Sequence, residues 1–126
     1  MPDADVILAA TRFATALAVR GVEPGDRVAI HLPNSPQLLI SLFGILKAGA
    51  VATLASPLYE KRELAYQLND SGARVLVTLS QRDILAKAIA AGAEAHLHHL
   101  IVSNIKDYFP PALNTLFPVF KAKKRG

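Results

Sequence analysis

The sequence predicts an α/β fold, a partial doubly wound sheet with mostly parallel strands and helices on both faces. Short apolar stretches at 27–32, 50–55, 74–79 and 97–102 are typical of strands that are buried on both sides. Longer segments with apolar residues at helical spacing precede and separate them. This alternation of helix and strand is typical of a parallel sheet with crossover helices.

Residues 6–20 are predicted to form the first helix, because apolar residues recur there every three or four positions. These residues are Val6, Ala10, Phe13 and Leu17. Gly21 stands where such a helix would end. The stretch 23–26 (EPGD) then predicts a turn, with proline fixing one φ angle and glycine accepting a positive φ.

Three further helices are expected between the strands. The segment 36–48 is apolar nearly all round and should be buried, with Asn34 or Ser35 as its cap and Pro36 at its first position. The third helix is expected over 60–68, with Glu60 as a poor cap that costs about 1 kcal/mol or less. The stretch 80–83 (SQRD) predicts a capping box for a fourth helix that runs to Gly92.

Composition excludes several classes of protein. The chain has no cysteine, which excludes disulfides, cysteine-ligated metals and thiol nucleophiles. Residues 1–120 hold ten basic and ten acidic side chains, so the net charge of +4 resides entirely in the last six residues. A nucleic-acid-binding domain would spread its basic residues over a face, so no nucleic-acid partner is expected.

The sequence favours a cytoplasmic location. The start of the chain is acidic where a secretory signal needs positive charge. The longest apolar run, 38–46, is stopped by Lys47 and is shorter than the roughly 20 residues that a spanning helix needs. A buried core helix is therefore the better interpretation.

Four stretches follow one another in an order and spacing that together form a specific pattern. They are 13–32 (FATALAVRGVEPGDRVAIHL), 32–36 (LPNSP), 44–51 (GILKAGAV) and 57–73, which contains PLY, REL and QLNDSGA. In this pattern the chain resembles the N-terminal part of AMP-forming acyl-CoA synthetases of the adenylate-forming ligase superfamily. The stretch 104–124 further resembles the long-chain fatty-acid–CoA ligase branch.

The resemblance implies an enzyme that uses ATP, Mg²⁺, a fatty acid and coenzyme A. Such enzymes form an acyl adenylate and release pyrophosphate, and the thiol of coenzyme A then displaces AMP. The family's glycine-rich phosphate loop is absent here, because the glycines at 21, 25, 44, 49, 72, 92 and 126 are isolated. The acidic ribose-binding motifs and the C-terminal domain with its catalytic lysine are absent too. We therefore expect a fragment that is inactive on its own, binds no cofactor alone and holds no catalytic residue.

Four polar residues are candidates for the substrate or nucleotide side of a site. Asn34, Ser35, Ser56 and Tyr59 follow predicted strands, and in open parallel sheets the carboxyl edge faces the ligand crevice. The alternative is structural, with Asn34 and Ser35 as helix caps and Tyr59 packed against the core. We favour the structural interpretation and assign no catalytic role to any of the four.

The histidines can be interpreted either as functional residues or as structural ones. His31 stands among apolar neighbours and is expected to be a packed residue at a strand end rather than a catalytic base. His96, His98 and His99 resemble a metal cluster, and His96 and His98 would share one strand face. Glu94 is the single carboxylate beside them, so we favour a polar strand edge and expect no metal site.

The chain divides into an incomplete N-terminal α/β subdomain, 1–103, and a proline-broken apolar segment with a basic tail, 104–126. The tail combines aromatic and basic side chains that suit an anionic membrane surface. They are Phe117, Phe120, Lys121, Lys123, Lys124 and Arg125.

Three questions remain open: what the tail contacts, whether the chain is a ligase fragment, and whether it dimerises. The tail could lie peripherally on the inner membrane face or pack on the remainder of an enzyme. A non-catalytic α/β binding module or a membrane-surface module is the alternative to a ligase fragment. Uncovered sheet edges and apolar helix faces favour a homodimer or poor solubility.

Overall fold

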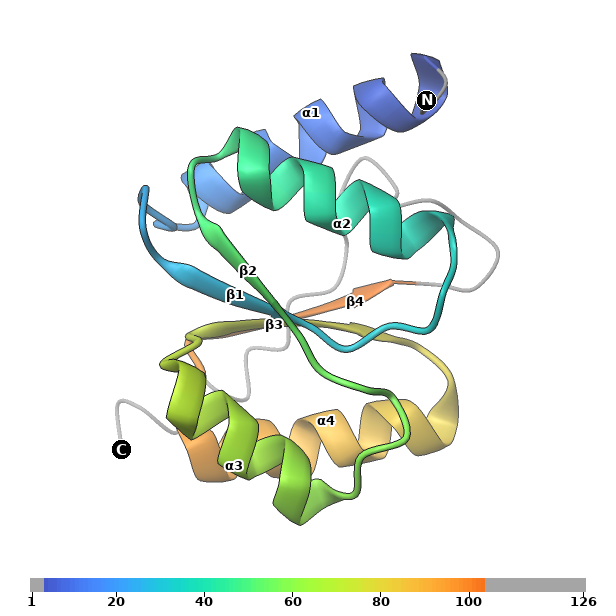
Figure 1. The fold of residues 1–126 in the computed structure, drawn as a ribbon, viewed down its shortest axis with the longest axis vertical. Coiled ribbons are helices and arrows are strands. Elements are labelled where there is room, and N and C mark those ends of the chain that lie inside the picture. The colour runs from blue at the N-terminus through green and yellow to red at the C-terminus, as the bar shows by residue number, and fades with distance from the viewer. Residues whose placement is uncertain (1–3, 104–126) are drawn as a thin grey trace.

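The computed structural model describes residues 4–103, in which four helices alternate with four strands (Figure 1). This order confirms every element that the sequence predicts, with ends that shift by a few residues. The elements in chain order are α1 (Ala4–Val19), β1 (Arg27–Ile30), α2 (Pro36–Lys47), β2 (Val51–Leu54), α3 (Lys61–Ser71), β3 (Val75–Leu79), α4 (Arg82–Ala95) and β4 (His99–Ser103).

The strands form one sheet in the order β2-β1-β3-β4, and each neighbouring pair is parallel. From β1 the chain moves to β2 on one side, and α3 then carries it back across β1 to β3 on the other side. Ile30 is in register with both Leu54 and Val77, so three strands run level near their carboxyl ends. The direction of winding changes at β1, which makes the gap between the ends of β1 and β3 the topological switch point.

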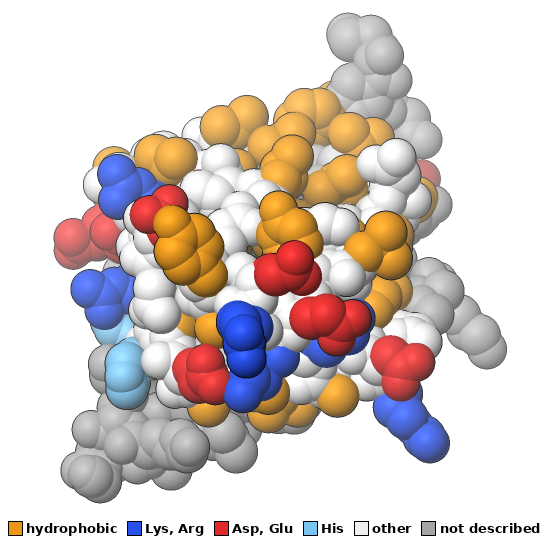
Figure 2. Space-filling model, turned by 60° about the horizontal axis from the view of Figure 1, so that its bottom comes forward, with side chains coloured by type: hydrophobic (Ala, Val, Ile, Leu, Met, Phe, Trp, Pro, Cys, Tyr) orange, Lys and Arg blue, Asp and Glu red, His pale blue; other side chains and the backbone are white. Residues whose placement is uncertain are grey.

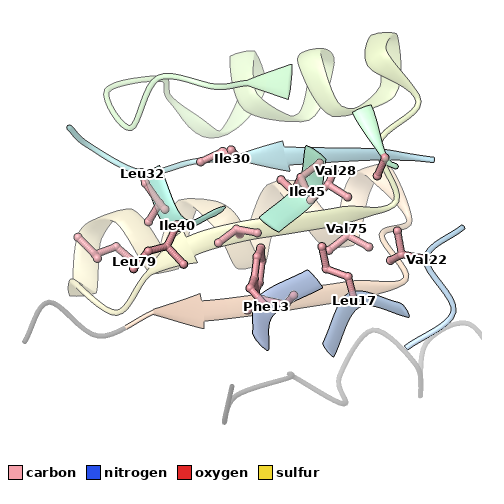
Figure 3. Close-up of a cluster of buried hydrophobic side chains, with 13 residues drawn as sticks. Phe13, Leu17, Val22, Val28, Ile30, Leu32, Ile40, Ile45, Val75 and Leu79 are labelled. Carbon is pink, nitrogen blue, oxygen red and sulfur yellow. The ribbon is translucent and has the colours of Figure 1, made fainter. Parts of the chain in front are cut away.

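The helices cover both faces of the sheet, which confirms the doubly wound arrangement. Helices α1 and α2 pack on each other above one face, and α3 and α4 pack on each other below the opposite face (Figure 1). Two apolar clusters fill the space between the layers. Phe13 and Leu17 of α1 and Ile40 and Ile45 of α2 meet Val28 in the first cluster (Figure 3). In the second, α3 and α4 pack on the sheet through small and branched side chains such as Leu64 and Ala88.

Burial differs among the strands, and of the two edge strands β4 is buried while β2 is not. The two central strands are buried along nearly their whole length, which is why their sequences are apolar without alternation. Strand β2 lies at an edge and exposes Val51 and Leu54. Among residues 4–103, β2 therefore has a neighbouring strand on one side only.

One predicted detail of the helix starts needs correction. The cap of α4 is Gln81, whose Oε1 accepts the Ile84 N–H at 2.9 Å, so the predicted capping box at Ser80 is wrong. The physical reason is that the Ser80 N–H donates to the Ser103 carbonyl at 2.8 Å and thereby extends the pairing of β3 with β4 by one residue. At the start of α3, the Glu63 Oε1 accepts the Glu60 N–H at 2.9 Å, so Glu63 supports a helix start whose cap residue is predicted to be a poor one.

Within residues 4–103 no helix has both the length and the apolar character that crossing a membrane requires. Helix α2, which contains the longest apolar run, instead packs on α1 and the sheet and has a buried face.

Candidate functional site

The carboxyl edge of the sheet is the candidate site, because the loops after β1, β2 and β3 leave it side by side. The register sets this arrangement: the Ala55 N–H donates to the Ile30 carbonyl, and the His31 N–H donates to the Val77 carbonyl at 2.7 Å. Each of the three loops leads into a helix within a few residues. Helix starts and strand ends are thus brought together at one edge.

The loop after β1 holds Asn34 and Ser35, and Ser35 is the N-cap of α2. Its hydroxyl accepts the Leu38 N–H at 3.3 Å and donates to the Pro33 carbonyl at 2.9 Å. Pro36 occupies the first helical turn, where its missing N–H costs nothing. Asn34 is exposed beside this cap. The structure therefore gives Ser35 a structural role.

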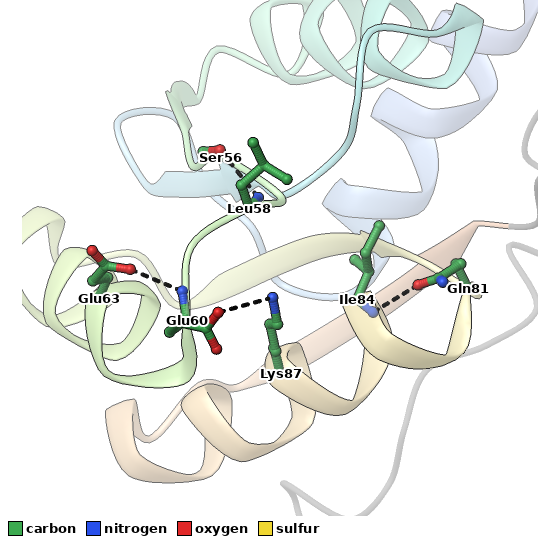
Figure 4. A network of polar contacts seen from close by, with 7 residues as sticks. All are labelled: Ser56, Leu58, Glu60, Glu63, Gln81, Ile84 and Lys87. Atoms are coloured by element: carbon green, nitrogen blue, oxygen red, sulfur yellow. Dashed lines mark hydrogen bonds and ion pairs between the residues drawn. The ribbon is translucent and has the colours of Figure 1, made fainter.

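The loop after β2 holds Ser56 and Tyr59. The Ser56 hydroxyl accepts the Leu58 N–H at 3.1 Å, and the Ser56 carbonyl accepts the Tyr59 N–H at 3.1 Å, so both bonds serve a tight turn (Figure 4). Tyr59 is half-buried and packs against the apolar cluster between the sheet and helices α3 and α4. It also lines a shallow surface hollow along α3 with Arg62 and Tyr66.

Sequence reasoning missed the loop after β3, which lies on the other side of the switch point. Its residues Ser80 and Gln81 face the loop of Asn34 and Ser35 across the ends of β1 and β3. Only the strand order shows that these two loops are neighbours, because β1 and β3 are the strands on either side of the switch point. No sequence signal short of that order points to these two residues.

His31 follows β1 directly and is completely buried. Its Nδ1 lies 2.9 Å from the Thr78 Oγ1, and its Nε2 has no hydrogen-bond partner in the part of the chain that is described. Burial, with a smaller contribution from the Lys87 charge, lowers its pKa from 6.5 to about 4. A neutral, enclosed imidazole agrees with the predicted packed histidine and not with an accessible catalytic base.

The other histidines do not form a metal site. His96 ends α4 in a left-handed conformation with φ of 58°, and β4 begins at His99, so the predicted shared strand face of His96 and His98 is wrong. His99 donates from Nε2 to the Arg20 carbonyl at 3.2 Å. Within residues 4–103, no group of three histidine, aspartate or glutamate side chains could hold a metal ion.

The remaining polar contacts at this edge connect the two lower helices. Glu60 at the start of α3 forms an ion pair with Lys87 of α4, with Oε2 and Nζ 3.8 Å apart (Figure 4). Together with the helix caps, this ion pair holds the loops in place on the α3–α4 side of the sheet. The arrangement can position backbone at the crevice. Its hydroxyl–imidazole contact, between Thr78 and His31, is fully buried and therefore inaccessible to a substrate. The predicted membrane-surface residues, 117–125, lie outside the described residues.

A family model described as "AMP-binding enzyme" matches residues 4–118. A long-chain-fatty-acid–CoA ligase of Bacillus subtilis strain 168 is 37% identical over 120 residues, covering 95% of this chain and 21% of the relative. One of Escherichia coli O157:H7 is 41% identical over 97 residues, covering 76% of this chain and 17% of the relative.

Solved structures match as well. A Mycobacterium tuberculosis fatty acyl CoA synthetase superposes with a TM-score of 0.74 at 26% identity, over 92% of this chain and 23% of that structure. An anthranilate CoA ligase in complex with anthranoyl-AMP gives 0.73 at 30% identity, over 85% and 20%. These matches confirm the resemblance seen in the sequence motifs. The chain spans about a fifth of the length of the relatives it matches.

Proposed function

The chain belongs to the AMP-binding enzyme family, and from this premise we propose that it is an N-terminal part of a long-chain fatty-acid–CoA ligase. The observation that carries the proposal is the 37% identity to the Bacillus subtilis ligase over 95% of this chain. In this function a fatty-acid carboxylate attacks the α-phosphorus of ATP, and pyrophosphate leaves. The thiol of coenzyme A then attacks the acyl carbon, and AMP leaves with the electron pair of the broken bond.

Activation explains why such an enzyme needs two steps. Adenylation turns a poor leaving oxygen into a good one, and magnesium with cationic groups stabilises the negative charge that develops on the phosphates. The proposed share of residues 1–103 in this chemistry is support. Residues 4–103 form an α/β subdomain. We propose that its carboxyl edge holds the loops after β1 and β3 beside the nucleotide side of the full site.

The proposed subdomain has no catalytic activity by itself. Its polar side chains at the carboxyl edge are engaged in caps and turns, as Ser35, Ser56 and Gln81 are. The glycines of the chain are isolated, so none forms a cluster whose backbone amides would hold a triphosphate. ATP, Mg²⁺ and coenzyme A are therefore proposed as ligands of a complete ligase rather than of this chain alone.

A chimera tests the proposal directly. The segment of the Bacillus subtilis ligase that aligns with residues 4–103 is replaced by these residues, and acyl-CoA formation from a long-chain fatty acid is measured. We expect the chimera to keep ligase activity, because the exchanged subdomain has the same fold and supplies the same supports. A chimera that melts like the parent ligase but forms no acyl-CoA would contradict the proposal.

The isolated chain provides the complementary measurement. With ATP, Mg²⁺, fatty acid and coenzyme A present, we expect the 126-residue chain to release no pyrophosphate. ATP-dependent shifts of backbone amides at Asn34, Ser35, Ser56 and Tyr59 would instead favour the alternative, a stand-alone α/β binding module. A Ser35→Ala variant then distinguishes a hydroxyl contact to the nucleotide from a loop that merely moves.

A second role is proposed for 104–126, from the pairing of aromatic and basic residues in the sequence. Phe117 and Phe120 precede four cations, and each cation contributes about 1 kcal/mol at an anionic membrane surface. The test is sedimentation with vesicles that contain phosphatidylserine. Salt-sensitive binding that is lost when 104–126 are deleted is expected. Equal binding of the shortened chain would end the membrane-surface hypothesis.

A further inference from the structure

A cavity of about 290 Å³ lies at the amino edge of the sheet, on the side opposite the candidate site. Basic and imidazole side chains from three strand starts and one helix end line it. They are Arg20, Arg27, Arg74, His98 and His99. In Figure 2 blue basic and pale-blue histidine side chains lie at the left-hand margin, with red acidic side chains next to them.

The parallel register brings these residues together. Val75 is in register with both Val28 and His99, so the residues before β1, β3 and β4 meet at one edge. The Arg74 N–H donates to the Arg27 carbonyl at 3.3 Å, and the His98 N–H donates to the Arg74 carbonyl at 2.7 Å. The backbone of Arg27 and Arg74 is therefore held at the amino ends of the adjacent strands β1 and β3.

The positive charge in the cavity is not balanced. Among residues 4–103, none of the three arginines forms an ion pair within 4.0 Å. The two ion pairs of this part of the chain join α4 to α3 and to Glu60, the residue before α3. Asp26 is the one carboxylate on the wall, and its Oδ2 already accepts the Glu23 N–H at 2.8 Å. Three guanidinium groups thus face a single engaged carboxylate.

Arg20 supplies a further unsatisfied donor. Its terminal NH1 group donates to the Ala16 carbonyl at 3.1 Å, which holds the side chain against the end of α1. Its Nε is buried and has no hydrogen-bond partner among the described residues. A buried donor without an acceptor is unfavourable. Because this atom is shielded from solvent, Arg20 contributes its charge to the cavity wall rather than this N–H.

We propose that this cavity binds a phosphate-bearing anion, with Arg27 and Arg74 as its principal contacts. Guanidinium groups present parallel N–H donors that match the oxygens of a phosphate, which a single ammonium group does not. The volume exceeds that of one phosphate and suits a polyphosphate or a phosphate carried on a larger molecule. The site does not depend on the proposed ligase activity, since it lies at the opposite edge of the sheet.

The test is a titration of the full ¹⁵N-labelled chain with inorganic pyrophosphate at constant ionic strength, without magnesium, which would compete for the anion. Saturable shifts are expected at the amides of the cavity wall, with a dissociation constant in the range of about 1 mM or below. Shifts that grow linearly, or that sulfate reproduces equally at the same concentration, would overturn the proposal.

Variants locate the contacts. Arg27→Gln and Arg74→Gln are each expected to weaken pyrophosphate binding about tenfold or more, because each removes a charge-assisted pair of hydrogen bonds. Arg27→Lys, which keeps the charge but loses the fork, should fall between these variants and the parent chain. Arg62→Gln, on the exposed surface of α3, is the matched control and should bind as the parent does. Equal binding by all four folded variants would refute the assignment.

ATP and AMP distinguish the source of the phosphate. Pyrophosphate and ATP that bind well while AMP does not would locate recognition in a polyphosphate chain. AMP that binds as tightly as ATP, with the same amides shifted, would show that one terminal phosphate on a larger molecule is enough. A nucleotide that shifts the carboxyl-edge loops and leaves the amino edge unmoved would contradict a phosphate site here.

Discussion

His31 and Thr78 meet inside the sheet, with the imidazole Nδ1 and the hydroxyl Oγ1 2.9 Å apart and both residues fully buried. The first follows β1, and the second lies in β3, so the contact bridges the two central strands near the switch point. It is a polar contact in an otherwise apolar layer. Breaking a buried hydrogen bond leaves a polar group unsatisfied, which costs more free energy than the intact bond contributes. Because the His31–Thr78 contact joins β1 to β3, the alignment of the two strands depends on the protonation of the imidazole.

Stability should decrease as the pH falls from about 6.5 to about 4. Burial holds the pKa of His31 at about 4 in the folded protein, whereas the unfolded chain takes up the proton near 6.5. In this window the unfolded state binds more protons, so acid favours unfolding; above 6.5 this residue adds no pH dependence. The two pKa values limit the loss in the free energy of unfolding to roughly 3 kcal/mol. Urea unfolding at several pH values measures this loss.

A paired substitution isolates this contribution. His31→Leu combined with Thr78→Val removes both polar partners and leaves no unpaired hydroxyl. The doubly substituted chain should lose the part of the pH dependence that lies between 4 and 6.5 and keep the part due to carboxylates at lower pH. If its stability depends on pH as steeply as that of the parent, another group is responsible.

Gly44→Ala should destabilise the chain, although alanine normally favours a helix interior over glycine by about 1 kcal/mol. A Cβ at this position would lie 2.6 Å from Phe13 Cδ2 and 3.0 Å from the Ala10 carbonyl, where α1 crosses α2. Phe13 is buried and cannot withdraw. Overpacking of this kind costs about 1–3 kcal/mol, measurable by urea unfolding, and adding Phe13→Leu should recover part of the loss.

The fold was predictable because its strands and helices differ in pattern. Strand β3 (Val75–Leu79) has no polar residue except Thr78, which pointed to burial between layers. The same expectation for α2 is wrong in part, because α2 lies in an outer layer and leaves Leu39 and Leu46 exposed. The strand order was not predictable, since it depends on which side of β1 each crossover passes. No local residue pattern in the sequence records that choice.

The candidate site was predictable in part. Asn34 and Ser35 follow a strand and precede a helix in the sequence, and they do lie at the carboxyl edge. Ser80 and Gln81 could not be placed opposite them without the strand order. The cap of α4 was misplaced by one residue because serine is the better cap by propensity, but pairing of Ser80 with β4 retains it in the sheet.

Gln81→Ala should lower stability while Ser80→Ala should not. The Gln81 Oε1 satisfies the Ile84 N–H at 2.9 Å at the start of α4, and removing a helix cap costs about 0.5–2 kcal/mol. The Ser80 contact with β4 uses backbone atoms, which alanine keeps. Thermal unfolding of both variants beside the parent measures the difference. A larger loss for Ser80→Ala would reinstate the serine as the cap.

Ser35→Ala separates structure from chemistry at the candidate site. The substitution removes a hydroxyl that accepts the Leu38 N–H and donates to the Pro33 carbonyl, so a loss of about 1 kcal/mol is expected in unfolding experiments. Asn34→Ala, on the exposed neighbour, should change stability by less than about 0.5 kcal/mol. In the chimeric ligase, assayed well below its melting temperature, neither substitution should alter kcat or the KM for ATP, because the hydroxyl is occupied in the cap. In Ser35→Ala, the KM for ATP could instead rise tenfold with kcat and folding unchanged. That outcome would mean that the hydroxyl leaves the cap to contact the nucleotide. Ser35 would then belong to the site itself.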